Sequence, residues 1–179
     1  VREALRTRSF WQMAAALGIG QIAMSASVHQ IPAMTSFGVS RTTAGLVIAA
    51  VSMVSMVGRV GTGFLGDWMD KRKVIAAAFA CQFVGLLAFA YTGSFWNILA
   101  FTLFWGLGWG GSVPVRFALL ADYFGRRSYG SIMGVMSTVS TVFGVAGPVL
   151  VGWMADVRGN YQEPFVLMAL TVLIAVPII

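Results

Sequence analysis

The sequence has little charge and few of the residues from which soluble enzymes and metal sites are built. Charged residues make up 10% of the chain, whereas a soluble domain carries about 25%, so a soluble fold would lack the polar surface to cover its apolar residues. One cysteine, Cys81, excludes an internal disulfide, and the single histidine, His29, predicts no metal site. The apolar segments hold no paired carboxylates, and the motifs HExxH and GxSxG are absent. We therefore predict that the protein is not an enzyme and needs no cofactor.

Long apolar segments are what the sequence does contain. Hydrophobic residues make up 58% of the 179 residues and the mean hydropathy is +0.83, which excludes a disordered chain. A helix needs about 20 apolar residues to cross a bilayer, and lipid offers an exposed backbone amide no partner. We therefore expect an all-α membrane protein, with a cytoplasmic juxtamembrane segment at residues 1–9 and a six-span unit at residues 10–179. The predicted spans occupy residues 10–37, 43–66, 74–92, 96–121, 129–155 and 164–179, the last of them truncated.

Lysine and arginine are distributed unevenly between the loops. Eight of them lie in the first segment and in the loops after the second and fourth spans, and only Arg41 and Arg158 lie on the other side. Because short cytoplasmic loops carry the excess of basic residues, we expect both ends of the chain to be cytoplasmic. The net charge of +6 is then a topology signal in a multi-pass protein of the plasma (inner) membrane, and its partner is lipid rather than nucleic acid.

The second span carries a polar stripe that includes an arginine. Four polar residues recur at intervals of three and four, which places them within an arc of roughly 80° on one helix face: Ser52, Ser55, Arg59 and Thr62. Arg59 lies about 12 Å inside the expected cytoplasmic end, where an arginine costs roughly 2.5–3.5 kcal/mol to insert. It is either a structural arginine satisfied by a carbonyl or an acid, or the anion site of a cavity. Its depth and its stripe favour the anion site.

The first span repeats this pattern, with Gln21, Ser25 and His29 on one face. Three roles are open to His29: a hydrogen-bonded packing residue, a contact that lines a cavity, or a proton carrier.

The fourth and fifth spans are rich in glycine. Four of the six residues at 106–111 are glycines, which predicts close helix packing and gives Trp109 room to project into a cavity. Arg116 lies near the expected cytoplasmic end, where it can snorkel or pair, so we interpret it as structural. In the fifth span, Gly147, Pro148 and Gly152 predict close packing and a bend.

The chain also contains a faint internal repeat. The second span ends Gly-Phe-Leu-Gly-Asp at residues 63–67, and the fifth ends Gly-Trp-Met-Ala-Asp at residues 152–156. The first copy ends inside the cell and the second outside, as two inverted three-helix repeats require. The third and sixth spans hold few internal polar residues, so we expect them at the periphery.

These residues resemble a known family. Residues 58–67, with Asp-Lys-Arg-Lys at 70–73, resemble the signature loop of the major facilitator superfamily between its helices eight and nine, and residues 121–134 resemble its matching loop after helix ten. Residues 147–161 resemble helix eleven and its exit in monocarboxylate transporters and oxalate:formate antiporters. The resemblance implies the C-terminal six-helix half of a twelve-helix, alternating-access transporter, whose partner is the missing N-terminal six-helix half.

The resemblance also implies roles for two residues. In that branch the arginine of helix eight holds the substrate carboxylate, and Arg59 occupies its position; the aromatic residue of helix ten falls near Trp109. Monocarboxylate transporters have an aspartate, linked to proton coupling, where this chain has Ser55. The oxalate antiporter has a second cation on helix eleven, where residues 129–155 have none. The resemblance therefore extends neither proton coupling nor dicarboxylate selectivity to this chain.

We predict a secondary active transporter of a small organic anion, a monocarboxylate, with a coupling proton or counter-anion as a further candidate partner. The predicted substrate-binding residues are Arg59, Trp109, His29, Gln21 and Ser55. The predicted gating residues at the cytoplasmic face are Asp67, Lys71, Arg72, Asp122, Arg126 and Arg127. The alternatives are an uptake or efflux carrier for another solute, in which the arginine of the second span serves structure alone, and a six-span scaffold or sensor that moves nothing.

Overall fold

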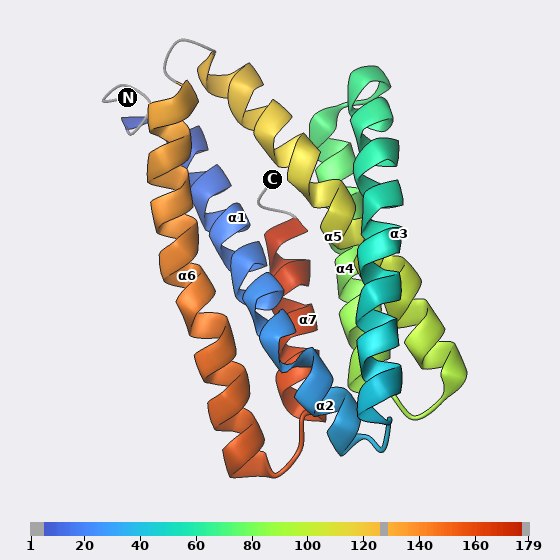
Figure 1. Cartoon of the computed structure of the whole chain (residues 1–179). Coiled ribbons are helices and arrows are strands. Elements are labelled where there is room, and N and C mark those ends of the chain that lie inside the picture. Colours follow the sequence, from blue (N-terminus) through green and yellow to red (C-terminus); the bar gives the residue numbers. More distant parts are fainter. Residues whose placement is uncertain (1–5, 126–128, 177–179) are drawn as a thin grey trace.

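The computed structural model describes residues 6–125 and 129–176, and every regular element in these ranges is a helix (Figure 1). Four of the described helices are long and apolar enough to cross a membrane, so the protein is an all-α, multi-pass membrane protein. In chain order the helices are α1 (Arg8–Ser25), η2 (Ala26–His29), α2 (Gln30–Ser36), α3 (Arg41–Trp68), α4 (Lys71–Ala90), α5 (Phe95–Phe124), α6 (Tyr129–Arg158) and α7 (Gln162–Ala175). The four long apolar helices are α3 to α6, and α7 is a shorter apolar helix.

The first predicted span is broken into three pieces. Pro32 lies in the first turn of α2, where it has no N–H to bond the carbonyl of Val28, and its ring crowds that carbonyl. Just before α2 the chain tightens into the 3-10 turn η2, a feature that often marks a hinge within a helix. The first span is therefore α1, η2 and α2 in series, with His29 and Gln30 at the second junction.

Polar caps and glycines set the helix ends. A side chain at the N-cap accepts a hydrogen bond from a backbone N–H in the first turn of α3, α4 and α5, at distances of 3.1, 2.9 and 3.3 Å. Glycines with positive φ, at +86°, +71° and +68°, follow α2, α5 and α6, where the backbone leaves the helix in a conformation that other residues rarely adopt. The capping residues are Ser40, Asp70 and Ser94, and the glycines are Gly38, Gly125 and Gly159.

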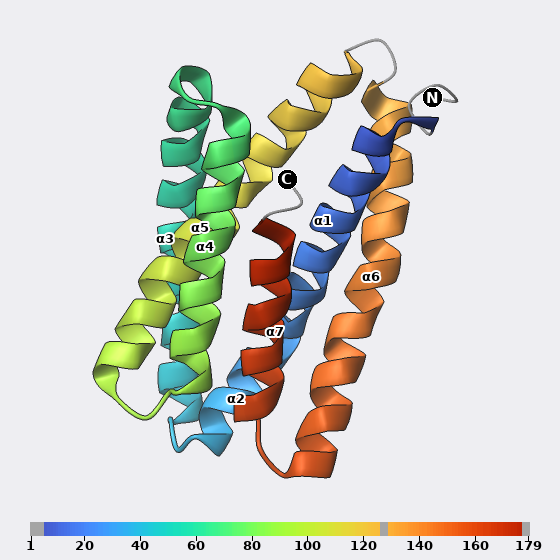
Figure 2. The ribbon, with the colours of Figure 1, turned by 180° about the vertical axis from the view of Figure 1, so that it is seen from behind.

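The helices form two groups along the chain, and the first helix of each group packs against helices of the other group. α1 packs against α6 and α7, whereas α5 packs against α3 and α4 (Figures 1 and 2). The first group runs from α1 to α4 and the second from α5 to α7. The first helix of each group therefore contacts the later helices of the other group. Because α1 and α5 begin at opposite ends of the molecule (Figure 1), the two groups have opposite orientations. This is the relationship that an inverted repeat of three spans requires.

α4 and α7 present an apolar face to the outside, whereas α3 and α6 leave most of their apolar surface uncovered. α4 and α7 lie side by side (Figure 2), and their exposed large side chains within the spans are apolar, for example Val84, Leu170 and Ile174. This face suits contact with lipid. In contrast, α3 and α6 bury 28% and 17% of their most apolar stretch, against 50% for α4 and α5.

The glycines of α5 bring it close to α3 and α4. A β-carbon built on Gly110 would lie 2.0 Å from the carbonyl oxygen of Ser55, and one built on Gly108 would lie 2.5 Å from that of Ala78. In the same contact, Gln82 donates a buried hydrogen bond of 3.0 Å to the Gly108 carbonyl. The glycine run therefore packs helices closely, as the sequence predicts, and it fixes the direction in which Trp109 leaves α5.

Candidate functional site

Arg59 and Trp109 lie against each other across α3 and α5. The guanidinium carbon of Arg59 is 5.9 Å from the centroid of the Trp109 ring, within reach of a cation–π interaction. The two ion pairs among the described residues join Lys71 to Asp122 and Arg158 to Glu163, so in that part of the chain Arg59 has no carboxylate partner. Its planar set of donors remains available to a ligand.

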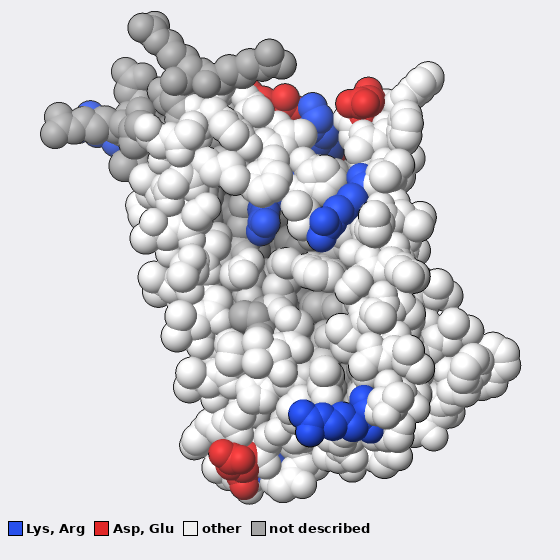
Figure 3. Space-filling model, in the orientation of Figure 1, with Lys and Arg blue, Asp and Glu red and all other residues white. Residues whose placement is uncertain are grey.

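Arg59 is deep within its helix. It stands nine residues before Trp68, the last residue of α3, which is about 13 Å at 1.5 Å per residue. It is also an exposed residue of this chain. Figure 3 shows that lysine and arginine atoms on this face form separate groups on a mostly uncharged surface, with acidic atoms confined to the two ends.

Trp109 also lines a cavity of about 170 Å³ between the first span, α3 and α5. Aromatic, apolar and polar side chains share its wall: Ser27, Val28, Gln30, Ile31, Ile48, Val51, Ser52, Trp105 and Trp109. Gln30 is 4% exposed, and its Nε2 amide has no hydrogen-bond partner among the described residues. The Nε2 atom is closed off from solvent, so Gln30 is an unpaired donor in the packing beside the cavity. The polar pattern of the first span does not single out Gln30, although a glutamine inside an apolar span is a signal for a cavity or a buried contact.

Ser55 lies at the contact between α3 and α5. It is 2% exposed, its hydroxyl donates a 2.7 Å hydrogen bond to the Ser52 carbonyl, and its backbone lies against Gly110. Ser55 is therefore buried between the two helices that carry Arg59 and Trp109, and it is not a lining residue of the cavity beside Trp109.

His29 joins the first span to α6. Its Nε2 lies 3.1 Å from the carbonyl oxygen of Pro148, and because a carbonyl only accepts, this nitrogen carries the proton of the bond. The ring also lies 3.6 Å from a β-carbon built on Gly152, and its centroid is 6.2 Å from that of Tyr161. These contacts favour the packing role among the three that the sequence left open. Pro148 and Gly152 therefore have a common partner, and Gly147 is buried in α6.

Gln21 lies in a second cavity, of about 200 Å³, between α1, α5 and α6. The two cavities have no lining residue in common, so the structure does not bring Gln21 to Trp109. Arg116 lines this second cavity. Its side chain is in neither of the ion pairs of the described residues, so of the two structural roles that the sequence offered, snorkelling or pairing, the ion pair is not formed.

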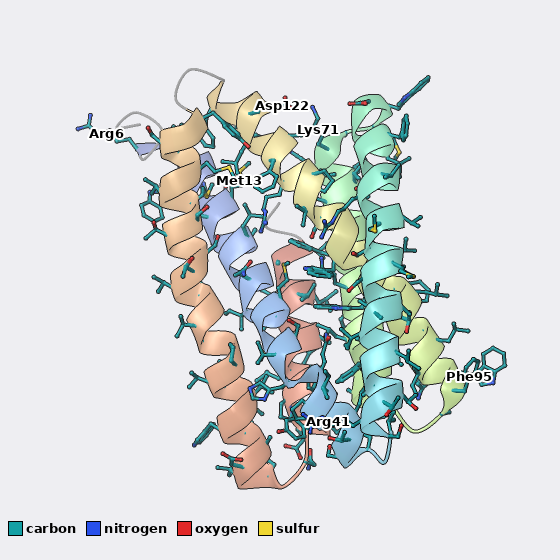
Figure 4. All side chains as sticks on the ribbon, in the orientation of Figure 1. Arg6, Met13, Arg41, Lys71, Phe95 and Asp122 are labelled. Atoms are coloured by element: carbon teal, nitrogen blue, oxygen red, sulfur yellow. The ribbon has the colours of Figure 1, made fainter. Side chains whose placement is uncertain are left out.

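Three of the predicted gating residues, Lys71, Arg72 and Asp122, lie where α4 begins and α5 ends (Figure 4). Lys71 and Asp122 form an ion pair of 2.5 Å, and the guanidinium carbon of Arg72 lies 5.2 Å from the centroid of the Tyr123 ring. Asp67 is exposed. Arg126 and Arg127 lie outside the described residues.

Comparison with known proteins identifies the family. The model of the Major Facilitator Superfamily matches residues 7–179. The chain belongs to the major facilitator superfamily. Its members are transporters, and the helices of the described residues, with their inverted arrangement, fit half of a transporter of this superfamily.

Curated relatives of this superfamily member include monocarboxylate transporters. Human monocarboxylate transporter 7 is 27% identical over 143 residues, which cover 78% of this chain and 27% of the relative. Bovine monocarboxylate transporter 13 is 28% identical over 151 residues, covering 78% of this chain and 33% of the relative. The uncharacterised transporter YycB of Bacillus subtilis is 23% identical and covers 88% of this chain. The chain thus spans about a third of the length of these relatives.

Solved structures show the same fold. The Escherichia coli fucose:proton symporter FucP superposes with a TM-score of 0.83 at 20% sequence identity, over 99% of this chain and 43% of FucP. A second FucP structure, in the outward conformation, gives a TM-score of 0.78. At this level of identity the match concerns the fold alone.

Proposed function

We propose that this chain is the C-terminal half of a secondary active transporter that carries a small monocarboxylate across the plasma membrane by alternating access. The observation that carries the proposal is the position of Arg59: a deep cation, without a carboxylate partner among the described residues, held 5.9 Å from a tryptophan that lines a cavity. A guanidinium and a carboxylate match in geometry and charge, and they form two parallel hydrogen bonds. The names of the relatives support the same substrate class.

The cavity beside Trp109 suits a small organic acid. Its volume of about 170 Å³ corresponds to five or six water molecules at about 30 Å³ each. Trp109 offers apolar surface to the carbon skeleton, while Ser27, an exposed residue of the cavity wall, offers a hydroxyl to a hydroxyl, keto or carboxylate oxygen. Arg59, whose guanidinium carbon lies 5.9 Å from the centroid of the Trp109 ring, supplies the charge.

Alternating access needs two states of the helix bundle, and two features of this half suit such a change. The Lys71–Asp122 ion pair ties α4 to α5 at one end, where it can hold one state closed. The 3-10 turn η2 interrupts the first span beside both His29 and the Trp109 cavity, where a hinge would move cavity residues. The bare surfaces of α3 and α6 are then available to the N-terminal half.

A neutral, hydroxylated solute is the second candidate. Tryptophan, serine and glutamine around one cavity also suit a polyol or a sugar, and the fold neighbour FucP carries fucose with protons. In that case Arg59 would serve the structure alone. The charge of the substrate therefore separates the two candidates.

Uptake by the full-length carrier in proteoliposomes distinguishes these functions. Labelled lactate should be taken up by the wild type, with acetate and pyruvate as competitors and fucose without effect. Arg59→Lys keeps the charge but loses the planar fork, so most lactate uptake should be lost while the protein still reaches the membrane. The matched control is Arg41→Gln, which removes an exposed cation at the far end of α3. Fucose uptake that survives Arg59→Lys, with no lactate uptake by the wild type, would instead establish the neutral solute.

A further inference from the structure

A second cavity, of about 200 Å³, lies between α1, α5 and α6, apart from the cavity beside Trp109. Half of its lining residues are polar or charged, and three helices contribute them: Gln21 from α1, Arg116 from α5, and Ser137, Ser140 and Thr141 from α6. Its volume corresponds to six or seven water molecules at about 30 Å³ each, which is room for a small organic anion.

Arg116 faces this cavity without a counter-charge. Asp122, the acid nearest along its own helix, is bound to Lys71 instead. The contact recorded for the guanidinium of Arg116 in the described structure is with the ring of Phe117, at 5.4 Å from the centroid, and Phe117 is itself a lining residue. An arginine in a membrane-spanning helix needs water or an opposite charge, and the lining of this cavity includes no acidic residue that could supply the charge.

Neutral donors surround this cation. The amide of Gln21 and the hydroxyl of Ser140 are in the cavity wall, and neither takes part in a hydrogen bond recorded among the described residues. The hydroxyl of Thr141 is already used, since it donates 2.8 Å to the Ser137 carbonyl. A guanidinium, an amide and a hydroxyl converge from three helices with no carboxylate between them, and such a set of donors selects an anion.

The second cavity is displaced along α5 from the first. Arg116 follows Trp109 by seven residues, close to two helical turns, so the two side chains leave the same face of α5 about 10 Å apart. The displacement is toward the end that carries Lys71 and Asp122 (Figure 4). The charge distribution of the loops predicts that this end is cytoplasmic.

We propose that this cavity is a second carboxylate site, in which Arg116 binds the substrate anion on its way between the Arg59–Trp109 site and the cytoplasmic end. The proposal rests on the proposed function, because it takes the same class of substrate. Gln21 and Ser140 act as further donors to the same carboxylate. A carboxylate could reach the site from a monocarboxylate in transit or as the far end of a dicarboxylate held at Arg59. The separate cavities favour transit, and the experiment below tests both sources.

The charge of the cavity is measured by the reaction of a cysteine in its wall. Ser140→Cys is placed in the full-length carrier, with Cys81→Ala and no other cysteines, and labelled with methanethiosulfonate reagents of opposite charge. Relative to Ser131→Cys, the ratio of anionic to cationic labelling rates at Ser140→Cys should be about tenfold higher, because a fixed positive charge lies nearby. Arg116→Gln should abolish this preference, and Arg116→Lys should keep it. Arg41→Gln is the charge-matched control, and Ser131→Cys, an exposed position of α6, is the reference site for the reagents.

Occupancy of the site is measured as protection from the anionic reagent. Lactate should slow labelling of Ser140→Cys severalfold, also in Arg59→Gln, but not in Arg116→Gln. Gln21→Leu should weaken protection by lactate while leaving the charge preference intact. This variant replaces Arg116→Gln as the test of the site if Arg116→Gln does not reach the membrane. Protection by succinate but not by lactate would overturn the transit role. An equal charge preference at positions 140 and 131, or lactate protection that persists in Arg116→Gln, would overturn the site itself.

Failure of the proposed function and failure of the second site give different results in uptake and in labelling. If Arg59→Gln takes up lactate at the wild-type rate, the Arg59 site is wrong, whereas the charge preference and protection at position 140 still report on Arg116. Normal lactate uptake that depends on Arg59, together with unprotected labelling at position 140, would remove only the second site.

Discussion

The guanidinium of Arg59 on α3 lies 5.9 Å from the ring centroid of Trp109 on α5, so the deep cation of one helix is held by an aromatic residue of another. A carboxylate would neutralise the charge of the arginine, whereas an aromatic ring leaves it uncompensated. A cation–π contact of this kind contributes about 0.5–2 kcal/mol. An incoming carboxylate can therefore add to the contact without first breaking an ion pair.

Trp109 should contribute to affinity through both its ring and its cavity surface. Trp109→Leu removes the face that contacts Arg59, and we expect the KM for lactate uptake to rise roughly 3- to 30-fold. Trp109→Phe keeps an aromatic face and should lose less. Trp96→Leu, which changes an exposed tryptophan at the start of α5, is the control. Equal KM values for Trp109→Leu and Trp96→Leu would show that Trp109 does not take part in binding.

Close packing of α5 on α3 should make Gly110 intolerant of a side chain. A β-carbon at this position would lie 2.0 Å from the Ser55 carbonyl oxygen, so Gly110→Ala should lower stability by about 1–3 kcal/mol. Gly45→Ala, where a β-carbon meets nothing within 4 Å, should be neutral or slightly stabilising, since alanine favours helix more than glycine. The melting temperatures of the two variants in detergent provide the comparison, and equal values would contradict the packing described here.

The Lys71–Asp122 ion pair should act on the equilibrium between states more than on stability. Both side chains are partly exposed, at 27% and 55%, and exposed pairs contribute under about 1 kcal/mol, yet a two-state equilibrium shifts with a difference of that size. Asp122→Asn should change the accessibility of cysteine probes at the cytoplasmic end while expression stays near normal. The exchanged pair Lys71→Asp with Asp122→Lys should restore the wild-type pattern; if it does not, the ion pair is not the latch.

Asp67 tests how far this latch extends. Asp67 lies in the last turn of α3, four residues before Lys71, the first residue of α4. We predict that Asp67→Asn shifts the accessibility of cysteine probes as Asp122→Asn does. Accessibility equal to the wild type would limit the latch to the contact between α4 and α5.

The orientation of the chain follows from its loop charges and can be measured directly. Eight lysines and arginines against two predict that both ends lie in the cytoplasm. Reporter fusions after Arg8 and after Arg127 should both read as cytoplasmic, and a fusion after Arg158 should not. A fusion after Arg158 that reads as cytoplasmic would reverse the assignment of α6.

Periodicity and composition were sufficient to predict the helices, and they selected Arg59 and Trp109 for separate reasons. Arg59 was selected for its depth on a polar stripe, and Trp109 for the glycines around it. The structure brings the two into contact because those glycines let α5 approach α3 closely.

Three side chains lie in surroundings that the sequence pattern does not predict, because contacts between helices determine them. Ser55 shares the stripe of Arg59, but the close approach of α5 buries it. Gln30 faces a cavity because η2 changes the helical register after α1, which a single helical period does not anticipate. Arg116 appeared able to pair locally, but Asp122 is bound by Lys71 from another helix.

Calorimetric titration of lactate into the purified full-length carrier measures whether Arg59 binds a carboxylate. The wild type should bind lactate. Arg59→Gln should weaken the affinity at the Trp109 cavity by at least about tenfold, because an uncompensated charge and a bidentate contact are both removed, while Arg41→Gln should bind as the wild type does. Lactate binding by Arg59→Gln with unchanged affinity, in a protein that melts at the wild-type temperature, would contradict the account.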